Sequence, residues 1–347
     1  MGKRIGVLTG GGDSPGLNAV IRAVVRQAVA HDFEVIGFLE GWKGVLEGEV
    51  EPLGLDKVSG ILVRGGTILK TSRTNPLKRA DGLPVMMENL RKQEIFALVA
   101  IGGDDTMSVA VELTKHGVKV VGVPKTIDND LPGTDFCFGF DTAVNVATEA
   151  IDRLHTTAEA HNRVIVVEVM GRDSGWIALY AGIAGGADFI LIPEKPFDIE
   201  EVCEALRSRH SRGRSFSIVV AAEGARFARA KPGQEVVLQT EKRDEFGHVR
   251  LGGIGQVLAS EIEKRTGFET RVVVLGHVQR GGSPSAFDRV LATRFGIAAV
   301  DLILSGEFGK MVALQGTRIV AIPLLDATAG TRPADEELYR IASVFFG

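Results

Sequence analysis

Continuous apolar runs that alternate with helical patterns are the feature that most restricts the fold of this chain. The runs are rich in β-branched residues, which is typical of parallel strands buried on both faces. They lie at 4–9, 34–39, 95–101, 119–124, 163–169, 189–192, 216–222 and 270–275. Helical patterns occur between them, for example at 16–30, 106–116, 141–160, 198–208 and 252–265. The alternation predicts an α/β fold with mostly parallel sheets that helices cover on both faces.

Length and composition narrow the class of protein further. A chain of 347 residues that is 45% hydrophobic predicts two domains. The net charge of −4 indicates neither a nucleic-acid nor a membrane partner, so an anionic substrate needs a local basic pocket. Two cysteines, Cys137 and Cys203, indicate no disulfide framework, and without a signal-like segment or an 18-residue apolar run we expect a cytoplasmic protein. The polar stretch 230–248 predicts a loop or a hairpin.

Glycines and charged residues gather where the apolar runs end. Ligands of open parallel sheets bind beyond the carboxyl ends of the strands, so we expect one site to collect most of these motifs. They are Gly-Gly-Gly-Asp at 10–13, Gly-Gly-Asp-Asp-Thr at 102–106, Pro-Lys-Thr-Ile-Asp-Asn-Asp at 124–130, Met-Gly-Arg at 170–172, Ala-Glu-Gly at 222–224 and Gly-His-Val-Gln-Arg-Gly-Gly at 276–282.

The first glycine turn, at 9–16, has two interpretations. Glycines between a strand and a helix let backbone N–H groups approach a phosphate, which the helix N-terminus favours. The same residues equally suit a tight turn without a ligand. The spacing is neither the dinucleotide fingerprint nor a Walker A loop, and Gly-x4-Gly-Lys-Ser/Thr does not occur in the chain. A nucleotide enzyme of the P-loop class is therefore disfavoured.

The two acidic motifs favour phosphoryl-transfer chemistry. Acids in a first helical turn are commonly caps, which explains one member of the Asp104–Asp105 pair. A carboxylate beside a phosphate-binding turn also suits Mg²⁺, and we favour this role for Asp104. Near Lys125 an Asx-rich turn explains some of the acids. Phosphoryl transfer needs a hydroxyl-proton acceptor and a cation, and Asp128 and Lys125 supply them.

Basic residues near the strand ends predict a sugar-phosphate pocket. Each one singly is most simply a solvated surface group, but five together supply forked donors for phosphate oxygens. Glu223 would accept hydrogen bonds from sugar hydroxyls, or it is only an acid in a first helical turn. The five are Arg163, Arg172, Arg271, His277 and Arg280.

Six longer motifs resemble the phosphofructokinase family, in the same order and over nearly the whole chain. They are IGVLTGGGDSPGLNAVIR, GGDDT, PKTIDND, NRVIVVEVMGR, AAEGA and ETRVVVLGHVQRGG. The resemblance implies two Rossmann-like three-layer domains with the active site in the cleft between them. Residues 1–140 with about 253–304 would hold the phosphoryl donor, and about 141–252 with 305–347 the sugar phosphate.

The resemblance also implies roles for single residues. It places Mg²⁺ at Asp104 and makes Asp128 the proton acceptor for the sugar's 1-hydroxyl, with Lys125 and Asp105 as further catalytic residues. The donor would contact Gly11, Gly103, Asp105 and Lys125. The positions that match sugar-phosphate contacts are Thr126, Ile127, Asp128, Arg163, Met170, Gly171, Arg172, Glu223, Arg271, His277, Val278, Gln279 and Arg280. In such enzymes the residues matching Arg163 and Arg271 come from a neighbouring subunit, so a homo-oligomer, dimer or tetramer, is expected.

Asp105 decides the expected donor. ATP-dependent members of the family usually carry Gly at this position, whereas diphosphate-dependent members carry Asp, with Lys at the place of Lys125. A carboxylate at 105 would occupy the place of the α-phosphate of ATP and repel it. Some ATP-dependent relatives also carry the Lys, so Lys125 is less diagnostic. The expected reaction is reversible, Mg²⁺-dependent transfer from diphosphate to fructose 6-phosphate, giving fructose 1,6-bisphosphate and phosphate.

Three alternatives and one regulatory question stay open. The chain could be an ATP-dependent phosphofructokinase, a kinase acting also on sedoheptulose 7-phosphate, or an inactive sugar-phosphate sensor. The sensor is disfavoured because the acid, base and metal positions are all chemically competent. Arg22, Arg26, Arg212 and Arg214 fit the family's effector site, but Leu55 and His155 stand where basic residues are expected. We therefore expect an enzyme without allosteric regulation.

Overall fold

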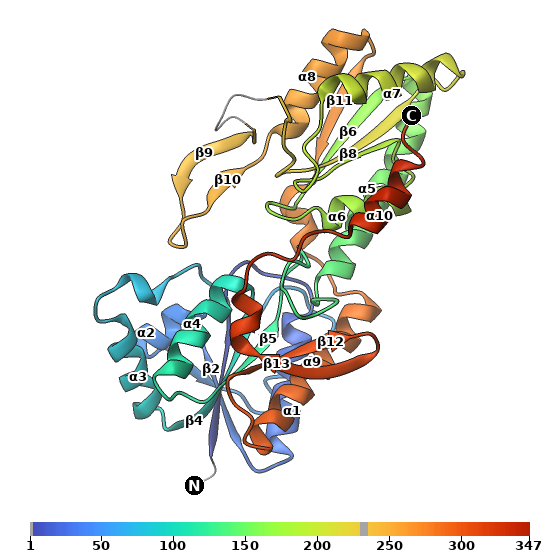
Figure 1. The fold of residues 1–347 in the computed structure, drawn as a ribbon. Coiled ribbons are helices and arrows are strands. Elements are labelled where there is room, and N and C mark those ends of the chain that lie inside the picture. The colour runs from blue at the N-terminus through green and yellow to red at the C-terminus, as the bar shows by residue number, and fades with distance from the viewer. Residues whose placement is uncertain (1–2, 230–234) are drawn as a thin grey trace. The chain divides into compact units, whose positions relative to one another are not determined.

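A computed structural model describes residues 3–229 and 235–347 of the chain. The chain forms two compact α/β units, which Figure 1 draws as ribbons. Unit 1 comprises Met1–Thr142, Asp244–His248 and Arg280–Thr331, and unit 2 comprises Ala143–Arg243, Val249–Gln279 and Arg332–Gly347. The expected α/β class, with two domains and mostly parallel sheets, is confirmed.

The sheet of unit 1 has seven strands in the order β13-β12-β5-β4-β1-β2-β3. Its inner strands run parallel, while β3 and β13 pair antiparallel at the two edges. The parallel strands are buried along nearly their whole length, as their continuous apolar runs predict. The strands are β1 (Arg4–Thr9), β2 (Glu34–Phe38), β3 (Val50–Pro52), β4 (Ile95–Gly102), β5 (Val120–Pro124), β12 (Lys310–Gln315) and β13 (Arg318–Pro323).

Helices cover both faces of this sheet. On one face α1 packs on α9, and Gly296 of α9 permits the close approach, because a Cβ there would lie 2.7 Å from the Cβ of Ala23. A second apolar cluster fills the other face, beneath α2, α3 and α4. The helices of unit 1 are α1 (Leu17–Val29), α2 (Trp42–Glu47), η1 (Pro76–Lys78), α3 (Gly82–Lys92), α4 (Asp104–Lys115), α9 (Ala286–Leu304) and η3 (Leu324–Thr328).

Unit 2 is built on a four-stranded parallel sheet in the order β11-β6-β8-β7. Helices α7 and α8 share one apolar cluster on this sheet, and α6 packs on β7 and β8. Its strands are β6 (Val164–Val169), β7 (Phe189–Leu191), β8 (Ser217–Ala222) and β11 (Thr270–Val274). The other elements that lie wholly or mostly in it are α5 (Phe140–His161), α6 (Trp176–Ala184), α7 (Ile199–Ser211), α8 (Ile254–Thr266), η2 (Gly276–Arg280) and α10 (Glu336–Ser343).

The polar stretch after β8 contains a hairpin, one of its two predicted forms. Strands β9 (Leu238–Arg243) and β10 (Val249–Leu251) pair antiparallel, and 244–248 form the turn between them. Residues 230–234, part of the same stretch, lie outside the described residues.

The boundaries of the units differ from the expected ones in two long segments, and residues 244–248 of the expected sugar-phosphate domain also lie in unit 1. Residues 253–279 were assigned to the donor domain, but β11 pairs with β6 and α8 packs on both, which places this segment in unit 2. Residues 305–331 were assigned to the sugar-phosphate domain, but β12 pairs with β5 and extends the sheet of unit 1. Strand pairing, which apolar patterning does not report, accounts for both corrections.

A buried carboxylate joins the first turns of α5 and α9 in unit 1. Asp288 is fully buried, and its Oδ2 accepts hydrogen bonds from the backbone N–H of Thr142 at 2.8 Å and from its Oγ1 at 2.5 Å. Burial raises the pKa of Asp288 to about 6, although the bonds from Thr142 oppose this rise. The folded chain therefore binds a proton here that the unfolded chain releases at lower pH.

Replacing Asp288 by Asn should remove a pH dependence of stability. Since its folded pKa lies above the value of about 3.9 for an unfolded Asp, the carboxyl stabilises the fold below pH 4 and loses this contribution as pH rises to about 6. Relative to Asp288→Asn, the unfolding free energy of the wild type should fall by about 2–3 kcal/mol over this range. Urea unfolding at pH 4 to 7 measures the difference, and parallel curves for the two proteins would contradict it.

Candidate active site

The glycine turn after β1 carries two cationic side chains on its carbonyl groups. Gly11 has a left-handed φ of 79°, which favours glycine, and a Cβ there would lie 3.4 Å from Nζ of Lys125. Nζ of Lys125 donates to the carbonyl oxygen of Gly12 at 2.6 Å, and Nη1 of Arg280 donates to that of Asp13 at 3.0 Å. The turn therefore places two positive charges beside its backbone, which suits an anion.

Lys125 is deeply buried at the carboxyl end of β5. Its backbone N–H donates to the carbonyl oxygen of Gly102 at 2.9 Å, which ties it to the end of β4. Burial, together with repulsion from Arg280, lowers the pKa of Lys125 to about 8, and nearby carboxylates oppose the shift. A buried ammonium group is a strong electrostatic ligand for a phosphate.

Two carboxylates lie in the first turn of α4, directly after Gly103. Asp104 is exposed, whereas the side chain of Asp105 is half-buried and 29% accessible. Burial and the neighbouring charge of Asp104 raise the pKa of Asp105 to about 6, with His248 opposing the rise. Both carboxylates benefit from the helix N-terminus, and only Asp104 offers its oxygens openly to solvent or a cation.

His248 is a member of this group that the sequence reasoning did not single out. Its Nε2 lies 3.2 Å and 3.3 Å from the two carboxylate oxygens of Asp105. Ligand atoms of Asp104, Asp105 and His248 all lie within 4.8 Å of one another. The only sequence signal was its place after Gly247 in a polar stretch, which predicts a turn and not a contact with residue 105.

The loop after Lys125 is closed by its own polar side chains. The hydroxyl of Thr126 donates to Oδ1 of Asp130 at 3.1 Å and accepts from the N–H of Asp128, also at 3.1 Å. Asn129 has a left-handed φ of 53°, and its side chain bonds to the backbone of Asp135 and Cys137. The side chain of Ile127 is fully buried and serves packing. The loop thus presents the partly buried Asp128 from a fixed backbone.

Asp130 differs electrostatically from its neighbours in this loop. Burial raises its pKa to about 7, and the charges of Asp128 and Asp104 act in the same direction. The hydrogen bond from Thr126 opposes the shift. At neutral pH the carboxyl group of Asp130 is therefore only partly ionised.

In unit 2 a second set of candidates meets at the carboxyl edge of its sheet. The N–H of Met170 donates to Oε1 of the buried Gln279 at 3.4 Å, and the N–H of Glu223 donates to the carbonyl oxygen of Val169 at 2.9 Å. Gly171 has a φ of 138°, and a Cβ there would lie 2.6 Å from the carbonyl oxygen of Ser174. Glycine is therefore required at this position.

The remaining candidates of this edge reach toward solvent. Nε of Arg172 pairs with the carboxylate of Asp173 at 2.7 Å. His277 and Val278 are exposed in η2, next to the buried Gln279. The boundary between the units falls directly after Gln279, so Arg280 belongs to unit 1.

Arg163 and Arg271 lie at the opposite edge of the same sheet. Arg163 directly precedes β6, Arg271 is the second residue of β11, and both guanidinium groups pair with the carboxylate of Glu269, at 2.7 Å for Arg163. With six residues in β6, about 20 Å separates this amino edge from Met170. Arg163 and Arg271 therefore lie at the other edge of this sheet from Arg172 and His277, and their expected place in a neighbouring subunit's site stays a prediction.

The structure thus gathers the predicted residues into three sets. Unit 1 holds Gly11, Gly103, Asp104, Asp105, Lys125, Thr126, Ile127, Asp128 and Arg280. The carboxyl edge in unit 2 holds Met170, Gly171, Arg172, Glu223, His277, Val278 and Gln279. The amino edge of that sheet holds Arg163 and Arg271.

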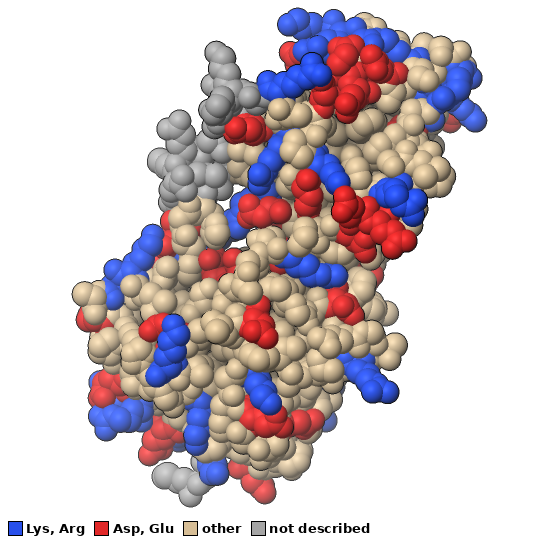
Figure 2. Space-filling view, viewed as in Figure 1, with Lys and Arg blue, Asp and Glu red and all other residues tan. Residues whose placement is uncertain are grey.

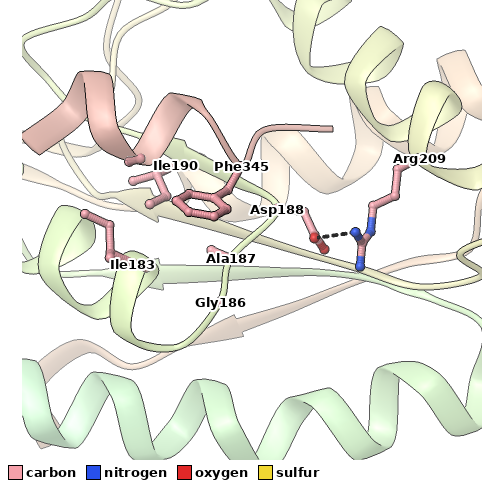
Figure 3. A pocket seen from close by; sticks show the side chains of 9 residues that line it. Ile183, Gly186, Ala187, Asp188, Ile190, Arg209 and Phe345 are labelled. Atoms are coloured by element: carbon pink, nitrogen blue, oxygen red, sulfur yellow. Dashed lines mark ion pairs between the residues drawn. The ribbon is translucent and has the colours of Figure 1, made fainter.

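A cavity elsewhere in unit 2 contains none of these residues. It has a volume of about 460 Å³ and lies between the ends of α6, α7 and α10 (Figure 3). Arg209 and Asp188 form an ion pair at one end, 3.0 Å apart, while Ile183, Ile190 and Phe345 line it with apolar groups. Arg212, one of the residues that fit the family's effector site, bonds to the carbonyl oxygen of Gly347, and His155, which departs from that pattern, bonds to the carbonyl oxygen of Gly185. Gly185 and Gly347 are close in sequence to lining residues.

The surface shows no dominant charge on the face that Figure 2 draws, where basic and acidic side chains are interspersed. Among the described residues, no helix has both the length and the apolar composition that crossing a bilayer requires.

Known proteins resemble the chain over its whole length. Residues 4–303 match the family described as Phosphofructokinase. A protein from Amycolatopsis methanolica named pyrophosphate–fructose 6-phosphate 1-phosphotransferase is 59% identical over 345 residues, which cover 99% of this chain and 100% of that protein. A Streptomyces coelicolor protein named ATP-dependent 6-phosphofructokinase 3 is 53% identical over 337 residues, covering 97% of this chain and 98% of that one.

A solved structure shares the fold. Phosphofructokinase from Saccharomyces cerevisiae superposes with a TM-score of 0.81 at 32% identity. The match covers 99% of this chain and 46% of the yeast chain, so this chain spans about half of that larger one.

Proposed function

Because the chain belongs to the phosphofructokinase family and is a phosphotransferase, we propose that it transfers a phosphoryl group from diphosphate to the 1-hydroxyl of fructose 6-phosphate. The products are fructose 1,6-bisphosphate and phosphate. Diphosphate and the product ester have similar phosphoryl-transfer potentials, so the reaction can run in both directions. The single observation that carries the choice of diphosphate is the half-buried carboxylate of Asp105, held in the first turn of α4.

Binding of the phosphoryl donor is assigned to unit 1. The glycine turn with Lys125 and Arg280 would bind phosphoryl oxygens, and the N-terminus of α4 would add favourable partial charge. The α-phosphate of ATP would meet the Asp105 carboxylate in a partly dehydrated site, where like charges repel strongly. Diphosphate ends before that point. The relative from Amycolatopsis methanolica, whose name carries pyrophosphate, supports the same choice.

The residues present fit a Mg²⁺ ion at Asp104. Mg²⁺ prefers one or two carboxylates together with phosphate oxygens and water, and Asp104 is the exposed carboxylate beside the glycine turn. The imidazole of His248 is a poor ligand for this ion, and its bonds to Asp105 already account for its position. Bound there, Mg²⁺ would neutralise charge that develops on the transferred group.

Asp128 is assigned as the acceptor of the proton from the sugar's 1-hydroxyl. Its loop is fixed by the bonds of Thr126 and Asn129, so the carboxylate has a defined place beside Lys125. Lys125 would stabilise charge on the transferred phosphoryl group. The carboxyl-edge set of unit 2, which includes Glu223 and His277, is assigned to the sugar phosphate.

The separation of Arg163 and Arg271 from that set supports a homo-oligomer. A strand length of about 20 Å is too great for their side chains to reach across. If these arginines bind the sugar phosphate, they must do so in a neighbouring subunit's site. We also propose that the enzyme lacks allosteric control, because Leu55 and His155 replace expected basic residues.

Replacing Asp105 by Gly should relax the choice of donor. Without the carboxylate the place of the α-phosphate becomes free of like charge, so kcat/KM with ATP should rise by about 10-fold or more relative to kcat/KM with diphosphate. Steady-state assays of the purified protein with each donor and Mg²⁺ measure both values. Unchanged donor preference would remove Asp105 from this role.

The wild-type protein decides between the two donors directly. Turnover with diphosphate that clearly exceeds turnover with ATP is the expected result. Efficient turnover with ATP and none with diphosphate would overturn the proposal and favour the ATP-dependent alternative, which the Streptomyces coelicolor relative represents by its name. Parallel assays with sedoheptulose 7-phosphate define the breadth of the acceptor site.

A further inference from the structure

The turn between β9 and β10, residues 244–248, is fixed to unit 1 by three kinds of contact. The carboxylate of Asp244 pairs with Nη1 of Arg73 at 3.1 Å. Oε2 of Glu245 accepts from the backbone N–H of Asn75 at 2.7 Å. The side chain of Phe246 packs against the apolar cluster beneath α2, α3 and α4. The turn is therefore held in place independently of its last residue.

The geometry within the turn directs His248. Oδ1 of Asp244 accepts from the backbone N–H groups of Phe246 and His248, each at 3.0 Å. Gly247 has a φ of 95°, a left-handed value that reverses the chain just before the histidine. With its backbone held in this way, His248 brings its ring to the Asp105 carboxylate, 143 residues away in the sequence.

The direction of the bond follows from the chemistry of the two groups. An ionised carboxylate only accepts hydrogen bonds, so Nε2 of His248 must carry the hydrogen. Contact with both carboxylate oxygens, at 3.2 Å and 3.3 Å, restrains rotation of the Asp105 side chain. The contact also places a hydrogen-bond donor beside the negative charge of Asp105, which would otherwise face an anionic substrate.

We propose that His248 is a positioning residue for the phosphoryl donor: it holds the Asp105 carboxylate in place and offsets its charge, so that diphosphate can bind next to it. The inference rests on the proposed function, because it takes diphosphate as the donor. Asp104 and Asp105 are adjacent acids, and a metal at Asp104 would leave Asp105 as the nearest uncompensated negative charge. His248 supplies that compensation without being a metal ligand.

A double-mutant cycle tests whether His248 acts through Asp105. Calorimetry with methylenediphosphonate and Mg²⁺ reports binding without turnover. His248→Ala should raise the Kd by about 10-fold, the effect expected of one hydrogen bond to a charged group that is partly exposed. In the Asp105→Gly background the same replacement should change the Kd by less than about twofold, because its partner is gone.

Kinetics and two further variants separate positioning from a structural role. His248→Ala should raise KM for diphosphate and change kcat less than about threefold. His248→Gln keeps a side-chain N–H donor and should restore most of the affinity. His116→Ala is the matched control, since this exposed histidine lies at the far end of α4, about 18 Å from Asp104 by helix length.

Two results would overturn the inference. An equal rise in Kd in the wild-type and Asp105→Gly backgrounds would show that His248 does not act through Asp105. An unchanged Kd in His248→Ala with a lowered melting temperature would show that it only stabilises the turn. Failure of the proposed function looks different: the wild type would then neither bind the diphosphonate nor turn over diphosphate, and would use ATP.

Discussion

Replacing Asp128 by Ser is expected to lower kcat by about 10²–10⁴-fold, the range found when a general base is removed. The affinity for fructose 6-phosphate should change little, because the carboxylate is needed for the hydroxyl proton and not for holding the sugar's phosphate. The loop itself should survive the change, since Thr126 bonds to the backbone N–H of residue 128 and Asn129 is fixed by its own side-chain bonds.

An isosteric variant tests whether the loss of kcat comes from a changed side-chain shape and not from the missing base. Asp128→Asn keeps the shape of the side chain and one accepting oxygen while removing its basicity. Both variants should show the same drop in kcat, measured with diphosphate at saturating fructose 6-phosphate, and similar values for sugar binding by calorimetry. Turnover within about threefold of the wild type in either variant would remove Asp128 from the role of base.

Two inactive variants should restore activity when their subunits are mixed. If each site takes Asp128 from one subunit and Arg163 from its neighbour, the variants Asp128→Ser and Arg163→Ser are each almost inactive alone. Random reassembly of equal amounts would give about a quarter of the sites both native residues. Refolding the mixture from denaturant and assaying it against each variant refolded alone measures the effect.

The control for this experiment pairs two variants of the same set. Asp128→Ser and Lys125→Met both alter unit 1 at the end of β5, so a site that takes the two residues from one subunit cannot be completed by mixing them. Activity of that mixture should stay at the level of the separate variants. Restored activity in the control, or none in the Arg163 mixture, would contradict the arrangement.

Much of the fold could be predicted because its parallel strands are buried on both faces. The run 95–101 is apolar at every position and 164–169 at every position but Glu168, and the structure has β4 and β6 at these places. The position of the glycine turn after β1 and of Asp104 in the first turn of α4 followed from the same logic, since a strand end and a helix start are both local features. Local sequence was enough for these parts.

The parts that escaped prediction depend on contacts between distant residues. Strand β12 joins β5 through a parallel pairing across almost 200 residues of chain, and nothing in 310–315 states which sheet it joins. His248 reaches Asp105 only because the turn 244–248 is anchored to Arg73, Asn75 and an apolar cluster.

Glu269 gives the two arginines at the amino edge of unit 2 a resident anion. Its carboxylate pairs with both guanidinium groups in the protomer, offsets one of their two charges and limits their rotamers before any ligand arrives. A phosphate that binds there replaces one anion by another, so the process is an ion exchange and not the capture of a charge by free cations. Its affinity is then a difference between two attractions, and added salt, which screens both, should alter it less than it alters binding to unpaired arginines.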